Sequence, residues 1–285
     1  MNNKKNYSLK SVLYKFVLSS FILLCNASYA VDSIEKQQIP TKPIKKEIHL
    51  QQSTIDKLLT DMILVKGGTF NMGSDSKTAL KRETPMHAVT LNSFHIAKTE
   101  VTQALFSELM GWNYSYFQCE TCAVNNISWF NMQLFIKRLN GVTGKAFRLP
   151  TEAEWEFAAK GGIKSEGYTY SGSNNIDDVA WYAGNAENKS HPVATKLPNE
   201  LGLYDMTGNL WEFVQDTMSR VAYTVEARNN PIIGDANDFS SKAMKVVRGS
   251  GYEFSGEESE VFRRDGATNN VRMPDIGFRL ALTKK

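Results

Sequence analysis

The chain has few residues that could carry metal or thiol chemistry. Its 285 residues include three cysteines and four histidines, and no histidine pair has a His-x-x-x-His or His-x-Glu spacing. The sequence also lacks the nucleophile pattern Gly-x-Ser-x-Gly, the phosphate-binding P-loop and the glycine pattern of dinucleotide-binding folds. These absences argue against a metallohydrolase, a serine hydrolase and a nucleotide-binding enzyme.

The chain also lacks a basic surface that would attract nucleic acid. Four of its 33 basic residues and none of its 30 acidic residues lie in the first thirty positions. The remainder therefore carries a formal net charge of about −1, and the basic isoelectric point comes largely from the N-terminus. We expect no nucleic-acid partner.

The N-terminus has the pattern of a secretory signal peptide. Four lysines precede an apolar run over Phe16 to Leu24, and Ser28-Tyr-Ala30 supplies small residues for cleavage. The run is too short to span a bilayer, so we predict a signal peptide over residues 1–30 and no stable membrane span after cleavage. A lipid anchor at Cys25 is the alternative, and Leu24 before it disfavours it. The predicted location is periplasmic or secreted.

The next thirty residues predict a tether. Residues 31–60 hold two prolines and several Lys and Gln, and have little apolar periodicity, with room for one helical turn around Ile55 to Leu59. A single domain over residues 61–285 follows. It begins near Met62 with a strand, a glycine turn and a second strand.

Three helices are indicated by their capping residues. Thr102 begins a helix that Gly111 ends, Ser128 begins one that Asn140-Gly141 ends, and Thr151 begins one that ends before Gly161-Gly162. The remaining sequence consists of short β-branched segments between Gly, Asn, Asp and Ser clusters. This pattern predicts a compact α+β module with little regular structure.

Three segments carry a family resemblance. Arg148-Leu-Pro-Thr-Glu-Ala-Glu-Trp-Glu156, then Gly202-Leu-Tyr-Asp-Met-Thr-Gly-Asn-Leu-Trp-Glu212, then Gly277-Phe-Arg279 resemble, in this order, the formylglycine-generating-enzyme (sulfatase-modifying factor) family. Further anchors are Glu100-Val-Thr102 and Val124 to Trp129. The resemblance implies a mixed fold akin to that of C-type lectins.

The cysteines that carry the family's chemistry are missing. In oxidase members, two cysteines five residues apart bind Cu(I) and convert a substrate cysteine to formylglycine. Aligned on Tyr252, these positions fall on Phe254 and Ser259, and Gly251 replaces a serine. Phenylalanine and serine cannot hold a soft metal ion, so we expect no copper and no formylglycine formation.

The segment at this position is acidic. Glu253, Glu257, Glu258 and Glu260 precede the pair Arg263-Arg264. A solvated loop is one interpretation. A glutamate acting as a general base, or a loop that binds a basic partner, is the other. The candidate catalytic residues are Tyr252, Glu253 and Arg264.

Cys119 and Cys122 remain after signal cleavage. A redox-active Cys-x-x-Cys pair lies at a helix N-terminus, whereas Ala-Val-Asn-Asn-Ile follows here, and a zinc site would need two more ligands. A local disulfide that constrains the loop over residues 116–124 explains the pair best.

The resemblance also implies a calcium loop. Carried over by position, Asp205 and Glu212 supply side-chain oxygens, and Thr207, Gly208 and Leu210 supply carbonyls. The family usually has Asn where this chain has Asp205. The alternative is a Gly-Asn turn with Trp211 packed in the core.

Two functions from different classes remain open. One is a binding or assembly module in the cell envelope, with a protein or peptide-like partner. The other is a periplasmic enzyme that modifies a peptide-like substrate without cysteine chemistry.

Overall fold

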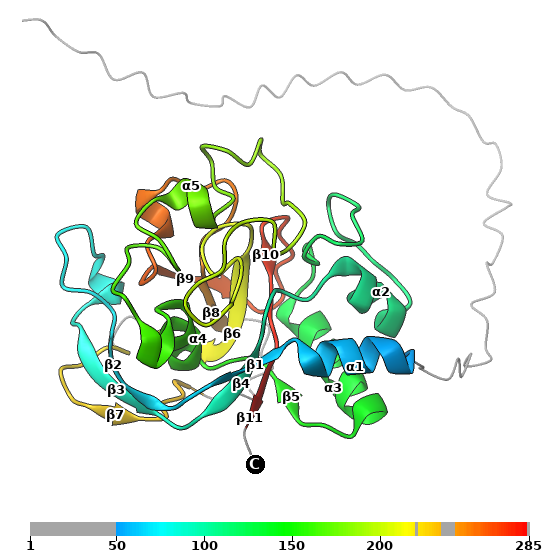
Figure 1. Ribbon diagram of the computed structural model, residues 1–285, viewed down its shortest axis with the longest axis horizontal. Helices are drawn as coiled ribbons and strands as arrows, with labels where there is room; N and C mark the ends of the chain where they lie inside the picture. Colours follow the sequence, from blue (N-terminus) through cyan, green and yellow to red (C-terminus); the bar gives the residue numbers. More distant parts are fainter. Residues whose placement is uncertain (1–49, 220–221, 235–242, 284–285) are drawn as a thin grey trace, which may run out of the picture. The chain divides into compact units, whose positions relative to one another are not determined.

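The computed structural model describes residues 50–219, 222–234 and 243–283 (Figure 1). The predicted signal peptide, Cys25 and residues 31–49 of the predicted tether lie outside the described residues. Within the described ranges, no helix has the length and hydrophobicity needed to cross a membrane.

Short helices and strands alternate along the described chain. The helices are α1 (Gln52–Thr60), α2 (Gln103–Met110), α3 (Trp129–Thr143), α4 (Glu152–Ala159) and α5 (Ile176–Val179), with 3₁₀ turns η1 (Lys81–Glu83), η2 (Gly162–Lys164) and η3 (Glu257–Ser259). The strands are β1 (Met62–Val65), β2 (Gly68–Met72), β3 (His87–Leu91), β4 (Phe94–Ala97), β5 (Phe147–Arg148), β6 (Trp211–Thr217), β7 (Arg228–Asn229), β8 (Met244–Arg248), β9 (Arg264–Thr268), β10 (Ile276–Gly277) and β11 (Ala281–Thr283). The predicted α+β class is confirmed.

The strands form three small sheets. Their orders are β1-β4-β11-β5, β10-β6-β8-β9 and β2-β3-β7. Strand β11, near the C-terminus, pairs with β4 and β5. Strands from the beginning and the end of the domain therefore lie in the same sheet. The signature segment 202–212 ends in β6, which pairs with β8 and, through Gly277 of the last signature segment, with β10.

Helix α1 corrects the predicted tether at its C-terminal end. Leu50 and Leu58 are buried, and Ile55 and Leu59 pack against the same core. The Glu108 carboxylate of α2 accepts hydrogen bonds from the Gln51 N–H (3.0 Å) and the Thr54 hydroxyl (3.1 Å). Residues 50–60 therefore belong to the folded domain. The sequence did not predict the packing of this helix, because the apolar residues that it contacts lie far away along the chain.

The capping residues predicted the helix starts correctly. The Thr102, Ser128 and Thr151 side chains each accept a hydrogen bond from a backbone N–H three residues on. Gly111 ends α2 in the left-handed conformation, as predicted.

The predicted end of α3 at Asn140-Gly141 is wrong. The helix continues to Thr143, and Gly144 ends it at a φ of 64°. The Asn140 side chain bonds the Phe147 N–H (2.7 Å) and C=O (2.9 Å), so it holds β5 instead of ending the helix. A glycine inside a helix costs only about 1 kcal/mol, which the packing of α3 offsets.

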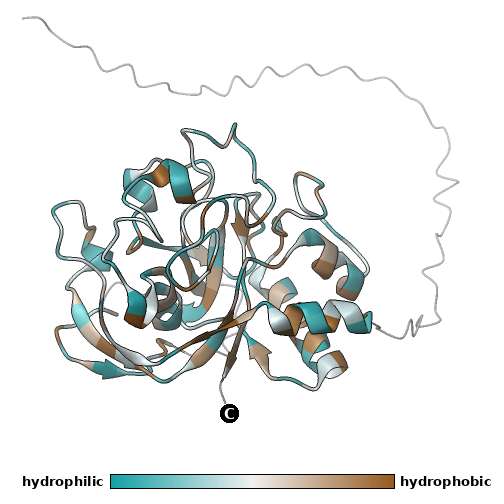
Figure 2. Ribbon diagram, in the orientation of Figure 1, coloured by the Kyte–Doolittle hydropathy of each residue, from teal (hydrophilic) through white to brown (hydrophobic). Residues whose placement is uncertain are grey.

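Two large apolar clusters hold these elements together. One joins α1, α2 and α3, where Phe135 packs on Phe106 and Phe278 with ring centroids 5.3 and 5.5 Å apart. The other joins α4 to strands β1–β4 through Trp155 and Phe157. Figure 2 shows apolar and polar residues interleaved along α1 and α3, as in helices buried on one face.

Candidate functional site

The glutamates of the α4 signature make buried ion pairs. Glu152 accepts two hydrogen bonds from Arg264, at 2.6 and 2.7 Å, and lies 3.3 Å from Arg248. Arg264 is buried, and its guanidinium also lies 4.6 Å from the centre of the Tyr223 ring. Arg264 therefore joins β9 to α4 through its ion pair with Glu152.

Glu156 is the second buried anchor of α4. It contacts Arg248 at 2.5 Å and Lys160 at 2.7 Å, and it accepts a hydrogen bond from the Gly73 N–H. Burial opposes its ionisation, but Lys160 and Arg248 outweigh burial and lower its pKa. The signature thus reflects a charge network inside the fold.

Tyr252 is buried in a separate small cluster with Ala123, Ala186 and Leu210. Burial, with a further contribution from Glu253, raises the Tyr252 pKa to about 12. The Glu253 side chain is exposed. Arg264 is instead paired with Glu152, and within the described residues it shares no hydrogen bond with Tyr252.

The two positions aligned with the oxidase cysteines are engaged in packing. Phe254 makes an edge-to-face contact with Trp211, with ring centroids 5.4 Å apart. Ser259 is buried, and its hydroxyl donates to the Ser255 carbonyl at 2.8 Å. Neither side chain offers a ligand for a soft metal.

Part of the acidic segment is held by ion pairs and hydrogen bonds. Arg263 pairs with Glu260 at 2.7 Å and with Glu83 of η1 at 2.9 Å. Hydrogen bonds from Ser255 lower the pKa of Glu258. Glu253, Glu257 and Glu258 are exposed, so the solvated-loop interpretation holds for them and fails for Glu260 and Arg263.

Glu212, one of the two carboxylates predicted to bind calcium, is paired inside the protein. Both Glu212 oxygens are occupied: Arg279 donates to them from Nε and Nη2, each at 2.6 Å, and Trp155 Nε1 donates at 2.9 Å. In this structure Glu212 is therefore the partner of Arg279, and the calcium site at Asp205, Thr207, Gly208, Leu210 and Glu212 stays a prediction. Thr207, Gly208 and Leu210 form the tight turn before Glu212.

Asp205 lies beside a second buried carboxyl group, that of Glu100. Asp205 Oδ2 accepts from the Ala194 N–H at 2.8 Å, and Glu100 Oε1 accepts from Asn209 Nδ2 at 2.8 Å. The other oxygen of each has no hydrogen-bond partner. Burial and the Asp205 charge raise the Glu100 pKa, and burial raises the Asp205 pKa to about 6. This pair therefore retains a proton more readily than exposed carboxyl groups.

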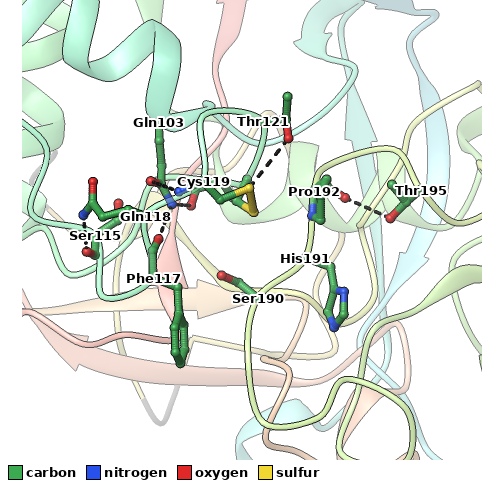
Figure 3. The surroundings of a disulfide bond; sticks show 12 residues. Gln103, Ser115, Phe117, Gln118, Cys119, Thr121, Ser190, His191, Pro192 and Thr195 are labelled. Carbon is green, nitrogen blue, oxygen red and sulfur yellow. Dashed lines mark hydrogen bonds between the residues drawn. A yellow bond between two sulfur atoms is a disulfide. The ribbon is translucent and has the colours of Figure 1, made fainter.

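Cys119 and Cys122 form a disulfide in the loop between α2 and α3 (Figure 3). Gln103, in the first turn of α2, organises this loop: Nε2 donates to the Phe117 carbonyl at 2.9 Å, and Oε1 accepts from the Cys119 N–H at 3.0 Å. Sequence reasoning missed Gln103, because a polar residue after a helix cap gives no sign that it is buried. Cys122 forms a β-bridge with Pro192.

The same loop exposes aromatic side chains. Tyr114, Tyr116 and Phe117 are 55%, 66% and 37% exposed. The Arg272 guanidinium lies 5.8 Å from the Tyr114 ring centre. Clustered aromatics at a surface are typical of contacts with other macromolecules.

A cavity of about 680 Å³ lies beside this loop. Its walls are formed by α1, residues 97–102, α2, residues 120–121 and residues 193–194. Helices α1 and α2 lie side by side here (Figure 1), joined by the Glu108 hydrogen bonds.

Comparison with known proteins agrees with this architecture. The family model described as "Sulfatase-modifying factor enzyme 1-like domain" matches residues 49–284. Chaperone protein LppX of Paenibacillus barcinonensis is 29% identical over 276 residues, covering 79% of this chain and 90% of the relative. Inactive C-alpha-formylglycine-generating enzyme 2 of Bos taurus is 25% identical over 282 residues, covering 78% and 87%.

A solved structure has the same fold. Treponema denticola variable protein 1 superimposes with a TM-score of 0.68 at 28% identity, covering 78% of this chain and 95% of that one. The chain therefore belongs to the family of sulfatase-modifying factor enzyme 1-like, or formylglycine-generating-enzyme-like, domains.

Proposed function

We propose that this protein is an accessory module that binds a polypeptide partner in the cell envelope, and that it is not a copper oxidase. Export through residues 1–30 to the periplasm or the exterior is part of this proposal. It is supported by the lysine-rich start, the apolar run and the small residues that follow it.

The main support for the proposal is that Phe254 and Ser259 stand where the oxidases of the family have their two cysteines. Copper oxidation in this family needs two thiolates there, and both side chains instead pack inside the fold. Without a soft ligand pair, oxygen has no metal at which to be activated. What the domain retains is a rigid scaffold with loops presented on it.

Two further observations support binding. One relative is named a chaperone and another is named an inactive member of the family. The exposed Tyr114, Tyr116 and Phe117 offer apolar area at a defined place, because Gln103 and the disulfide hold their loop.

The enzymatic alternative has less support. Acid–base chemistry on a peptide-like substrate would need Tyr252, Glu253 and Arg264 to converge on one atom. Arg264 is instead occupied by Glu152, and the Tyr252 pKa of about 12 makes this phenol a poor base near neutral pH.

The first test concerns chemistry. The protein is incubated with a Cys-x-Pro-x-Arg peptide, copper and oxygen, beside an active oxidase of the family as the positive control. We expect the peptide mass to stay unchanged with this protein. Appearance of the aldehyde product would refute the alignment of Phe254 and Ser259 with the oxidase thiolates.

The second test concerns binding. A photo-crosslinking amino acid replaces Tyr116 in the full chain expressed in its native host, and a matched variant carries it at Val225, which is 82% exposed. We expect a polypeptide adduct at position 116 that is absent at position 225. The adduct is identified, and the purified partner must then bind the purified protein. No adduct at position 116, or the same adducts at both positions, would count against the proposal.

A further inference from the structure

The 680 Å³ cavity between α1 and α2 lies outside the segment where the oxidases of the family carry their cysteines. None of its lining residues comes from the 247–265 segment. Its volume lies within the range of small-ligand sites. The cavity is therefore a separate candidate for recognition.

The apolar part of the cavity wall is aliphatic. Leu58 of α1, Val101, Leu105 of α2, Val193 and Leu280 line it. No aromatic side chain contributes to the lining, so the cavity offers no stacking platform for a planar ring. Its apolar wall suits an aliphatic chain.

Three glutamates also line the cavity, and two of them, Glu108 and Glu120, make no ion pair within the described residues. Glu108 accepts hydrogen bonds from the neutral Gln51 N–H and Thr54 hydroxyl. The Glu120 carboxylate, on the disulfide loop, is exposed and makes no ion pair in the described part of the chain. Glu100 is buried, and burial and Asp205 raise its pKa, so it contributes less negative charge than Glu108 and Glu120.

The basic residues of the lining do not balance these glutamates. Lys57 is paired with Asp61 at 2.6 Å, and Lys98 lies 5.2 Å from the centre of the Tyr204 ring. The lining therefore favours a positively charged group over a neutral or anionic one.

We propose that this cavity binds a lysine or arginine side chain of the polypeptide partner. The aliphatic stem lies against Leu105 and Val101, and the charged end faces Glu108 and Glu120. Long basic side chains combine these two properties, an apolar stem and a cationic head. The inference rests on the proposed function, because it names the chemistry by which the accessory module recognises a polypeptide.

The test uses a blocked peptide, acetyl-Gly-Ala-Lys-Ala-Gly-amide, titrated into the full-length protein and followed by NMR. The same peptide with Nε-acetyl-lysine removes the charge and keeps the stem, and butylamine represents a free amine. We expect the acetylated peptide to bind at least about tenfold more weakly than the lysine peptide and butylamine to bind more weakly still.

Two variants locate the binding. Glu120→Gln removes one charge from an exposed position and should weaken the lysine peptide about fivefold. Ala104→Trp, at an exposed lining position of α2, fills the cavity without changing charge and should abolish binding. Glu187→Gln is the matched control, because Glu187 is exposed, pairs with Lys189 and lies outside the cavity lining.

Equal binding of the charged and acetylated peptides, or unchanged binding in Ala104→Trp, would overturn the inference. Butylamine binding as tightly as the peptide would overturn the assignment to a polypeptide. If Glu120→Gln and Ala104→Trp leave peptide binding unchanged while the partner is still captured at position 116, only the cavity assignment fails. If no partner is captured either, the proposed function fails with it.

Discussion

Replacing Glu212 by glutamine leaves the guanidinium of Arg279 buried without its counter-charge. Glu212 and Arg279 are both fully buried, and they share two hydrogen bonds of 2.6 Å. Burial disfavours the charge on Arg279, but Glu212, with smaller contributions from Glu100 and Asp205, outweighs burial and raises the Arg279 pKa. Glutamine has nearly the same volume, so the substitution tests the charge and not the packing.

The expected loss is large. Removing one partner of a buried ion pair typically costs about 3–5 kcal/mol, because the remaining charge stays desolvated. For a domain of this size, 1 kcal/mol shifts the melting temperature by about 2–4 °C. We therefore expect Glu212→Gln to melt roughly 6–20 °C below the wild type.

The assay is thermal unfolding followed by circular dichroism, with urea unfolding at 25 °C as the second measure. Glu187→Gln, which disturbs only an exposed pair, should leave the melting curve unchanged. In Glu212→Gln combined with Arg279→Met, the loss should be smaller than the sum of the two single losses, because both act on one pair.

The same experiment separates the ion pair from a calcium site. If Arg279 neutralises Glu212, EDTA and CaCl₂ leave the wild-type melting temperature unchanged. A wild-type protein that EDTA destabilises, together with a Glu212→Gln variant that EDTA does not affect, would make Glu212 a calcium ligand. A Glu212→Gln variant that melts with the wild type would refute the reasoning on burial.

Three further predictions follow from other parts of the fold. Cys119 and Cys122 should be oxidised in the exported protein, so intact mass after alkylation without reductant should show neither thiol modified; two alkylated cysteines in freshly purified protein would contradict this. Burial, then the Glu152 carboxylate, raises the Asp216 pKa to about 7. Between about pH 3.9, where Asp216 ionises in the unfolded chain, and about pH 7, where it ionises in the folded protein, only the unfolded state loses the proton. The free energy of unfolding is therefore highest below pH 4 and falls by on the order of 4 kcal/mol as the pH rises to about 7. Asp216→Asn should flatten this slope in urea unfolding at pH 5, 6, 7 and 8, and an unchanged slope would count against it. Gln103→Ala should release the loop over residues 111–123, so amide hydrogen exchange there should rise several-fold while exchange in α4 stays constant; uniform change across both would indicate general destabilisation.

Local chemistry made parts of the fold readable from the sequence. Thr102, Ser128 and Thr151 each cap a helix through a residue three positions away, so the signal and its partner lie in the same short window. The signature segments likewise indicated the fold class. The predicted end of α3 at Gly141 was wrong because a glycine in the sequence favours a helix end without requiring one.

Contacts across the chain decided what the signature residues do. Glu212 meets Arg279 over 67 positions and Glu152 meets Arg264 over 112, so no spacing rule could pair them. The same is true of α1, where the N–H of Gln51 donates to Glu108 over 57 positions. By itself the sequence determined the helix starts, the family and the absence of a thiolate pair in the 247–265 segment. Only the tertiary structure showed which buried carboxylate pairs with which arginine. Folding removes water from these groups and brings together partners that lie far apart in the sequence.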